Sequence, residues 1–84
     1  MQEIYTVLYI NTDNEENSEI YSTHDSLHNA VNSLLKCAGY WYRNNGDIMQ
    51  NDVLVHKKEW NCLRNNIYEN LELTDVDIFR IIIS

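Results

Sequence analysis

The sequence predicts an α+β fold in which a three-stranded sheet carries two helices packed on one face, in the chain order ββααβ. Three observations predict it. Strand-like apolar segments lie near both ends, apolar side chains recur three and four residues apart in the middle, and polar stretches rich in Asn and Asp separate these segments. The two layers would form one domain, residues 1–84. A core this small gains stability from oligomerisation or from a partner.

The first predicted strand runs from Ile4 to Ile10 and is apolar on both faces. Because side chains alternate along a strand, Tyr5, Val7 and Tyr9 share one face, and Ile4, Leu8 and Ile10 share the other. A polar, acidic loop over residues 11–18 follows, and a second strand over residues 19–21 would complete a hairpin.

The clearest predicted helix follows this hairpin. Ser22, Thr23 and Asp25 are all residue types that favour the N-cap position. From there the apolar side chains recur at helical spacing, at Leu27, Ala30, Val31, Leu34, Leu35 and Ala38. The helix is expected to fray after Gly39 and to end before the sequence Asn44-Asn45-Gly46-Asp47.

Two interpretations remain open for the middle of the chain. The Asn45-Gly46 pair is interpreted as part of a loop between two helices, although this dipeptide also suits a hairpin between short strands at residues 40–43 and 47–50. A second helix is predicted from Asn51 or Asp52 to Leu71, because its apolar residues repeat three and four apart. The alternative is a strand over residues 53–55 followed by a shorter helix.

The last predicted strand, Val76 to Ile83, is also apolar on both faces. Phe79, Ile81 and Ile83 share one face, and Arg80 interrupts the opposite, aliphatic face. With two antiparallel helices of similar length before it, this strand would run parallel to the first strand. The sheet would then be mixed.

The two helices can cover only one face of such a sheet. Each large apolar side chain left exposed on the open face loses about 1.5 to 3 kcal/mol of the stabilisation that full burial would give. We therefore expect a partner or a second copy to cover this face. Tyr and Trp are enriched where interfaces carry binding energy. The predicted protein-binding residues are Tyr5, Val7, Tyr9, Phe79, Ile81 and Ile83, although the last strand also allows the reverse face assignment.

Charge and composition narrow the class of partner. The net charge of −7, from 13 acidic and 6 basic side chains, predicts no direct binding to nucleic acid or to a membrane surface. The sequence predicts no signal peptide and contains no apolar run of membrane-spanning length, and its two cysteines indicate free thiols. A cytoplasmic location is expected. The acidic residues expected to steer a basic partner are Asp13, Glu15, Glu16, Glu69, Glu72, Asp75 and Asp77.

No pattern in the sequence indicates catalysis, a metal site or a cofactor. His24 and His28 are four residues apart, but no acidic or cysteine ligand is tied to them by a known spacing. Cys37 and Cys62 fall on different predicted helices, without a base or cation placed to activate either thiol. Gly39 and Gly46 are the only glycines, which excludes a glycine-rich phosphate loop. The chain is therefore predicted not to be an enzyme.

One stretch of the chain resembles small uncharacterised proteins of phages and large DNA viruses. The resembling residues are the two terminal strands and the segment from Glu19 to Val31, where a short strand ending in an aromatic and Ser/Thr leads directly into a helix with Ala on its buried face. The resemblance implies a viral origin, in the host cytoplasm, and a small α+β fold. The predicted function is a non-catalytic protein-binding module, a viral accessory factor that self-associates or docks on a host or viral protein. The alternative is a structural component of a virus particle.

Overall fold

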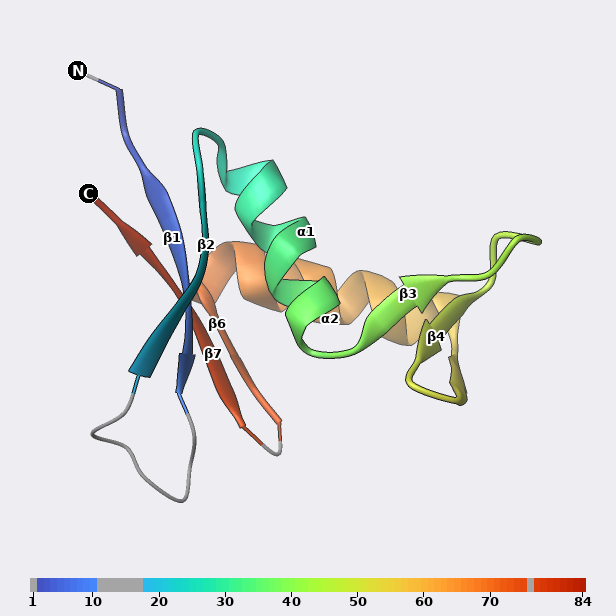
Figure 1. Ribbon diagram of the computed structural model, residues 1–84. Helices are drawn as coiled ribbons and strands as arrows, with labels where there is room; N and C mark the ends of the chain where they lie inside the picture. Colours follow the sequence, from blue (N-terminus) through green and yellow to red (C-terminus); the bar gives the residue numbers. More distant parts are fainter. Residues whose placement is uncertain (1, 11–17, 76) are drawn as a thin grey trace.

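The computed structural model describes residues 2–10, 18–75 and 77–84. It confirms an α+β fold with two helices, but the predicted order ββααβ and the single three-stranded sheet are wrong, because the strands form two sheets. The elements follow one another along the chain (Figure 1) as β1 (Tyr5–Ile10), β2 (Ser18–His24), α1 (Leu27–Cys37), β3 (Tyr40–Tyr42), β4 (Ile48–Gln50), β5 (Val53–Val55), α2 (Lys57–Asn70), β6 (Glu72–Thr74) and β7 (Ile78–Ile83).

The larger sheet has four strands in the order β2-β1-β7-β6, and every neighbouring pair is antiparallel. The prediction that the last strand runs parallel to the first is therefore wrong. The physical reason is β6, a strand that the sequence pattern did not reveal. It forms a hairpin with β7 and so reverses the chain once more between α2 and the final strand.

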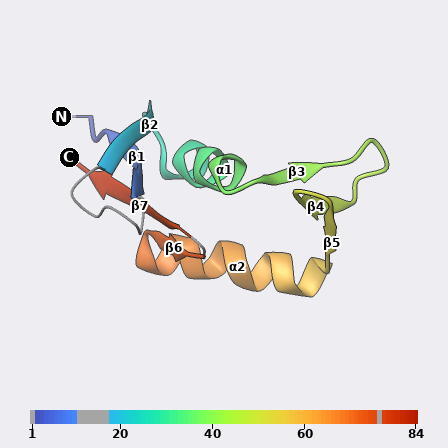
Figure 2. The same cartoon turned by 60° about the horizontal axis from the view of Figure 1, so that its bottom comes forward.

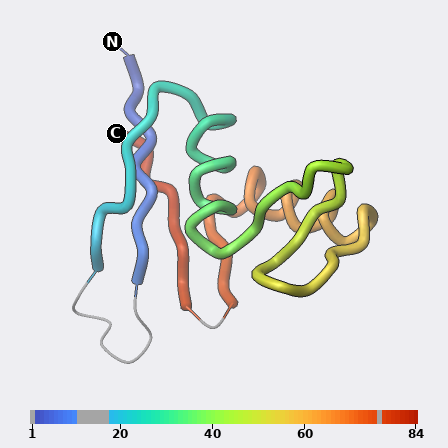
Figure 3. The backbone as a smooth tube through the Cα atoms, turned by 45° about the vertical axis from the view of Figure 1, so that its right-hand side comes forward, coloured from blue at the N-terminus to red at the C-terminus, as the bar shows by residue number. Residues whose placement is uncertain are grey.

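The smaller sheet consists of β3, β4 and β5, and it lies to one side of the four-stranded sheet (Figure 3). Here the structure follows the alternatives that the sequence left open, namely a hairpin at Asn45-Gly46 and a strand over Val53–Val55. Gly46 adopts a φ of +91°, which suits glycine, and the Asp47 amide donates to Asn45 Oδ1 at 3.1 Å. The predicted inter-helix loop is thus wrong, and α2 begins at Lys57.

Helix α1 is confirmed, with its beginning moved by a few residues. Its N-cap is Ser26, whose hydroxyl accepts a hydrogen bond from the Asn29 amide at 3.2 Å. Two of the predicted caps, Ser22 and Thr23, belong to β2 instead. The predicted apolar stripe is buried at Ala30, Val31, Leu34 and Leu35. Among the described residues, neither helix combines the length and the apolar character that crossing a membrane requires.

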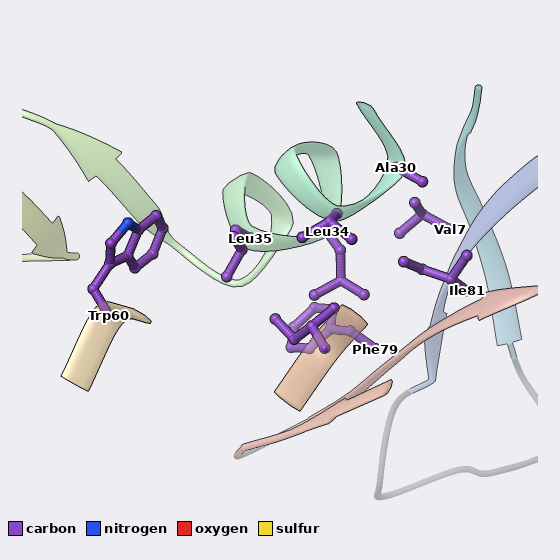
Figure 4. Packing of buried hydrophobic residues seen from close by; sticks show 9 residues of the cluster. Val7, Ala30, Leu34, Leu35, Trp60, Phe79 and Ile81 are labelled. Atoms are coloured by element: carbon purple, nitrogen blue, oxygen red, sulfur yellow. The ribbon is translucent and has the colours of Figure 1, made fainter. Parts of the chain in front are cut away.

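The core lies between the four-stranded sheet and the two helices, which pack on one face of that sheet (Figure 2). Leu34 of α1 lies at its centre, with Val7 of β1 on one side and Phe79 of β7 below it (Figure 4). The buried cluster consists of Val7, Ala30, Val31, Leu34, Leu35, Trp60, Ile67, Phe79 and Ile81. Each large aliphatic or aromatic side chain buried here contributes about 1.5 to 3 kcal/mol to folding.

Candidate functional site: the open face of the four-stranded sheet

The strand register decides which side chains face the helices. Val7 is paired with Ile81, and Tyr9 is paired with Phe79. Directly paired residues share one face of a sheet, and the buried members of these pairs belong to the core. The side chains that alternate with them, such as Leu8 and Ile82, therefore project from the opposite face.

That opposite face carries six aliphatic side chains on three adjacent strands, and we call this set the open face. Its members are Ile4, Leu8, Ile10, Ile20, Ile78 and Ile82. Ile20 is 68% exposed, Ile4 49% and Ile82 42%, while the other three are half-buried by their neighbours. None of the six belongs to the core cluster or to the side chains packed against it. Within the described residues, both helices lie on the other side of the sheet.

A balanced charge pair lies among these aliphatic side chains. Arg80 pairs with Leu8 on one neighbouring strand and with Glu72 on the other. Its Nη2 donates to Glu72 Oε1 at 3.2 Å, and both side chains remain partly exposed. A surface ion pair of this kind contributes at most about 1 kcal/mol to stability. It does, however, leave the middle of the open face electrically neutral in a chain whose net charge is −7.

The predicted protein-binding residues lie mostly on the wrong face. Val7, Phe79 and Ile81 are buried in the core, so the face assignment made from the sequence is reversed. Tyr5 and Tyr9 pack against that core, and Ile83 is exposed at the end of β7. Periodicity could not choose between two apolar faces. Arg80 could have identified the face that the helices leave open. A cation in the middle of a strand is costly to bury under helices without a partner, so the face that carries Arg80 should point away from them.

Tyr9 shows how a tyrosine serves the helix-covered face. Its ring lies 5.5 Å from the Phe79 ring, and its hydroxyl donates to Asp77 Oδ2 at 2.8 Å. This hydrogen bond, followed by burial and by the nearby negative charge of Asp77, raises the pKa of the Tyr9 phenol. The pKa of Tyr5 is raised in the same way, chiefly by its hydrogen bond to Glu3. Both phenols remain neutral donors at physiological pH.

The predicted steering carboxylates do not form one free array in the described part of the chain. Glu72 is paired with Arg80, and Asp75 accepts a hydrogen bond from Gln50 Nε2 at 2.9 Å. Asp77 accepts from Tyr9, whereas Glu69 is exposed on α2. The other three predicted residues, Asp13, Glu15 and Glu16, lie outside the described residues.

The histidines and cysteines occupy separate places. His24 lies in β2 beside Ser22 Oγ, at 2.9 Å, while His28 lies in α1 with Nδ1 3.0 Å from the Tyr68 hydroxyl. The two imidazoles therefore do not share a helix turn. In the part of the chain that the structure describes, no three His, Cys, Asp or Glu side chains are grouped to hold a metal ion. Burial raises the pKa of the Cys37 thiol, which makes it a weaker nucleophile.

The edges of the four-stranded sheet are less suited to association than its open face. The final strand β7 lies inside the sheet, so both of its edges are already paired. The edge strand β2 has a register shift opposite Val7 and Leu8, which leaves Tyr21 as an extra residue. Such bulges protect edge strands from pairing with another chain. The other edge, β6, is only three residues long.

Comparison with known proteins adds no further clue to the role of the open face. No protein-family model, curated protein or solved structure matches the chain. The surface and the charges described above therefore carry the functional inference.

Proposed function

We propose that this protein is a small, acidic, non-catalytic protein-binding module that self-associates through the open face. One observation carries the proposal. Six aliphatic side chains lie together on a sheet face that the two helices do not cover. Soluble proteins rarely leave such a contiguous patch exposed, because covering each large apolar side chain is worth about 1.5 to 3 kcal/mol.

Charge favours a second copy of this chain as the occupant. In the part of the chain that the structure describes, the open face has no surplus of acidic side chains with which to attract a basic foreign protein. Its central charges are Arg80 and Glu72, one of each sign. Because these two charges cancel, a second copy packed on this face would meet no net like charge there, and the contact could be isologous. Two sheets packed face to face would interdigitate their aliphatic side chains about 10 Å apart.

The size of the face sets the expected affinity. Three strands of six or seven residues and the three-residue strand β6, spaced about 4.8 Å apart, cover roughly 300 Å² per copy. Stable interfaces bury about 800 Å² per partner, so we expect a weak dimer with a dissociation constant on the order of micromolar. The net charge of −7 on each copy opposes association. Added salt should therefore strengthen the dimer by screening this repulsion.

A matched pair of variants tests the proposal by analytical ultracentrifugation across a wide range of protein concentration. Ile20 on the open face and Val53 on the smaller sheet are both β-branched strand residues, and both are 68% exposed. Ile20→Lys should abolish the dimer, because it buries an unpaired charge at the interface. Val53→Lys should dimerise like the wild type.

Two outcomes would contradict self-association through this face. One is a wild-type protein that stays monomeric at the highest concentration, at low and at high salt. The other is an equal loss of dimer in Ile20→Lys and Val53→Lys. Circular dichroism of both variants checks that each retains its fold.

A viral accessory role for this module is supported by the sequence resemblance, and the alternative is a structural component of a virus particle. The two roles make different use of the same open face. Stoichiometric copies in purified particles would support the structural role. Early expression together with absence from particles would support the accessory role.

A further inference from the structure

A second feature lies away from the open face, where α1, β3 and α2 meet. These three elements enclose a groove of about 620 Å³. This volume lies within the range of about 300 to 1,000 Å³ that is typical of small-molecule sites. The residues that carry the inference are Lys36, Tyr40, Trp41, Tyr42, Trp60 and Arg64, and we call this space the aromatic groove.

Aromatic rings form much of the wall of this groove. The Trp60 ring lies 5.3 Å from the Tyr40 ring and 6.0 Å from the Tyr42 ring, which meets it edge to face. Trp41 Nε1 donates to the Asn51 carbonyl at 2.7 Å, and this hydrogen bond holds the indole in place. Trp41 and Tyr42 are nevertheless 45% and 62% exposed. Their rings are therefore open to stacking with a planar ligand.

The rest of the lining is polar or aliphatic and includes two cations, which is unusual in this acidic chain. Lys36 and Arg64 line the groove, and no carboxylate from residues 2–10, 18–75 or 77–84 does, although the chain has 13 acidic residues. The Arg64 guanidinium carbon lies 6.0 Å from the centre of the Tyr68 ring. Arg64 Nε is buried and has no hydrogen-bond partner among the described residues. This nitrogen is out of reach of a ligand in the groove, so an anion would be bound by the rest of the guanidinium and by Lys36.

The charges around the groove also give the ligand an orientation. Burial raises the pKa of Tyr40, and the charges of Asp75 and Glu59 raise it further, so negative potential reaches the Tyr40 end. An anionic group would avoid that end and favour Arg64 and Lys36. A ring attached to it would then lie against one of the two exposed side chains, Trp41 or Tyr42, because neighbours in a strand point to opposite sides.

We propose that the aromatic groove binds a small planar aromatic anion of about mononucleotide size. Its ring stacks on one exposed aromatic side chain of β3, and its carboxylate or phosphate group is bound by Arg64 and Lys36. The groove and the open face lie on different elements. The proposal therefore does not depend on self-association, and it can be tested in the Ile20→Lys variant, which we expect to be monomeric.

The two tryptophans of the chain both line this groove, so their indole N–H signals report on it directly. The experiment follows these two signals by ¹⁵N NMR during titration with adenosine monophosphate and, separately, with 2-naphthoate. Adenosine and 2-naphthamide serve as the neutral partners of the two probes. We expect at least one anion to shift both indole signals in a saturable way, and its neutral partner to bind about tenfold more weakly. The arm that responds tells phosphate from carboxylate.

A matched pair of variants links the binding to the guanidinium. Arg64→Gln should weaken the bound anion about tenfold, whereas Lys58→Gln, an exposed cation of α2 outside the groove lining, should not. The proposal is overturned if neither anion shifts the indole signals, if the neutral partners bind equally well, or if the two variants behave alike. Stronger binding of a single-stranded oligonucleotide than of either probe would also overturn it in favour of a nucleic-acid site.

Discussion

The two sheets of this protein differ in what holds them together. The four-stranded sheet contributes Val7, Phe79 and Ile81 to the core under the helices. Each strand of the smaller sheet is three residues long, and Met49 is its buried side chain. The smaller sheet meets the rest of the molecule through Tyr40, Ile48 and Val55, which pack against the core cluster that includes Trp60. Tertiary packing thus stabilises the first sheet, and turns with a few aromatic contacts stabilise the second.

The largest expected effect compares the two sheets through their buried side chains. Leu34 is fully buried under the four-stranded sheet, so Leu34→Ala should lower the free energy of unfolding by about 3 kcal/mol. Met49→Ala should cost about half as much, and it should expose chiefly the amides of β3, β4 and β5 to hydrogen exchange. Urea unfolding and hydrogen exchange measure the two effects. Equal losses, spread over all amides, would show that both sheets unfold as one unit.

A smaller effect is expected at the two glycines that flank β3. Gly39 has a φ of +97°, and a Cβ there would lie 2.7 Å from Asn51 Oδ1. Gly46 has a φ of +91°, but a Cβ there would meet open space. Backbone strain alone should make Gly46→Ala cost about 1 kcal/mol, and displacing the Asn51 side chain should raise the cost of Gly39→Ala to about 2 kcal/mol.

Thermal unfolding of the two glycine variants, with circular dichroism as the signal, tests this order. Adding Asn51→Gly to Gly39→Ala removes the obstructing side chain, and it also relieves the positive φ of 53° at Asn51. The double variant should recover part of the lost stability. If Gly46→Ala proves the more damaging change, contact between Gly39 and Asn51 does not matter for the smaller sheet.

The smallest expected effect is on alkaline stability. The hydrogen bond to Asp77 raises the folded-state pKa of Tyr9 above its unfolded value of about 10, and burial raises that of Tyr40. The folded state therefore binds these two protons more tightly than the unfolded state does. The resulting contribution to the free energy of unfolding is complete below about pH 10, and it is lost as the pH rises through the folded-state pKa values. Tyr9→Phe should make the alkaline loss of stability shallower.

Urea unfolding at neutral and alkaline pH measures this slope, with Tyr40→Phe as the comparison in the smaller sheet. The pKa of Tyr9 is raised chiefly by a hydrogen bond, whereas the pKa of Tyr40 is raised chiefly by burial. If the free energy of unfolding of Tyr9→Phe depends on pH as in the wild type, the hydrogen bond to Asp77 does not couple the ionisation of Tyr9 to folding.

The sequence pattern predicted the elements that have a strong period and missed those that are short. Helix α1 and strands β1 and β7 were found because alternation and three-four spacing persist over many residues. The three-residue strands are too short to show a period. Val53 to Val55 also fits the helical spacing that α2 continues, so the correct interpretation was available only as an alternative. Strand β6 carries two polar residues in three, and nothing local marks it as a strand.

The sequence could predict that one apolar face of the sheet lies outside the helices. It could not predict which residues form that face. Both faces of β1 and β7 are rich in apolar residues, so the choice between them depends on which side the helices occupy. That choice is made by contacts between distant segments, such as Leu34 with the sheet. The aromatic groove was not predictable either, because it requires β3 to fold back beside α2. Its aromatic residues were recognised as unusual, but without a location.

The two ends of the described chain lie next to each other. The Ile4 amide donates to the Ser84 carbonyl at 2.9 Å, and the Ser84 amide donates back to the Ile4 carbonyl at 2.9 Å. A short peptide could therefore join these ends and leave the fold intact, with new termini opened at the exposed Asn45-Gly46 turn. Such a circular permutant would keep β1 and β7 as neighbours while freeing the tip of the smaller sheet. By the same geometry, the whole domain could be inserted into a surface loop of another protein, since its entry and exit points are side by side.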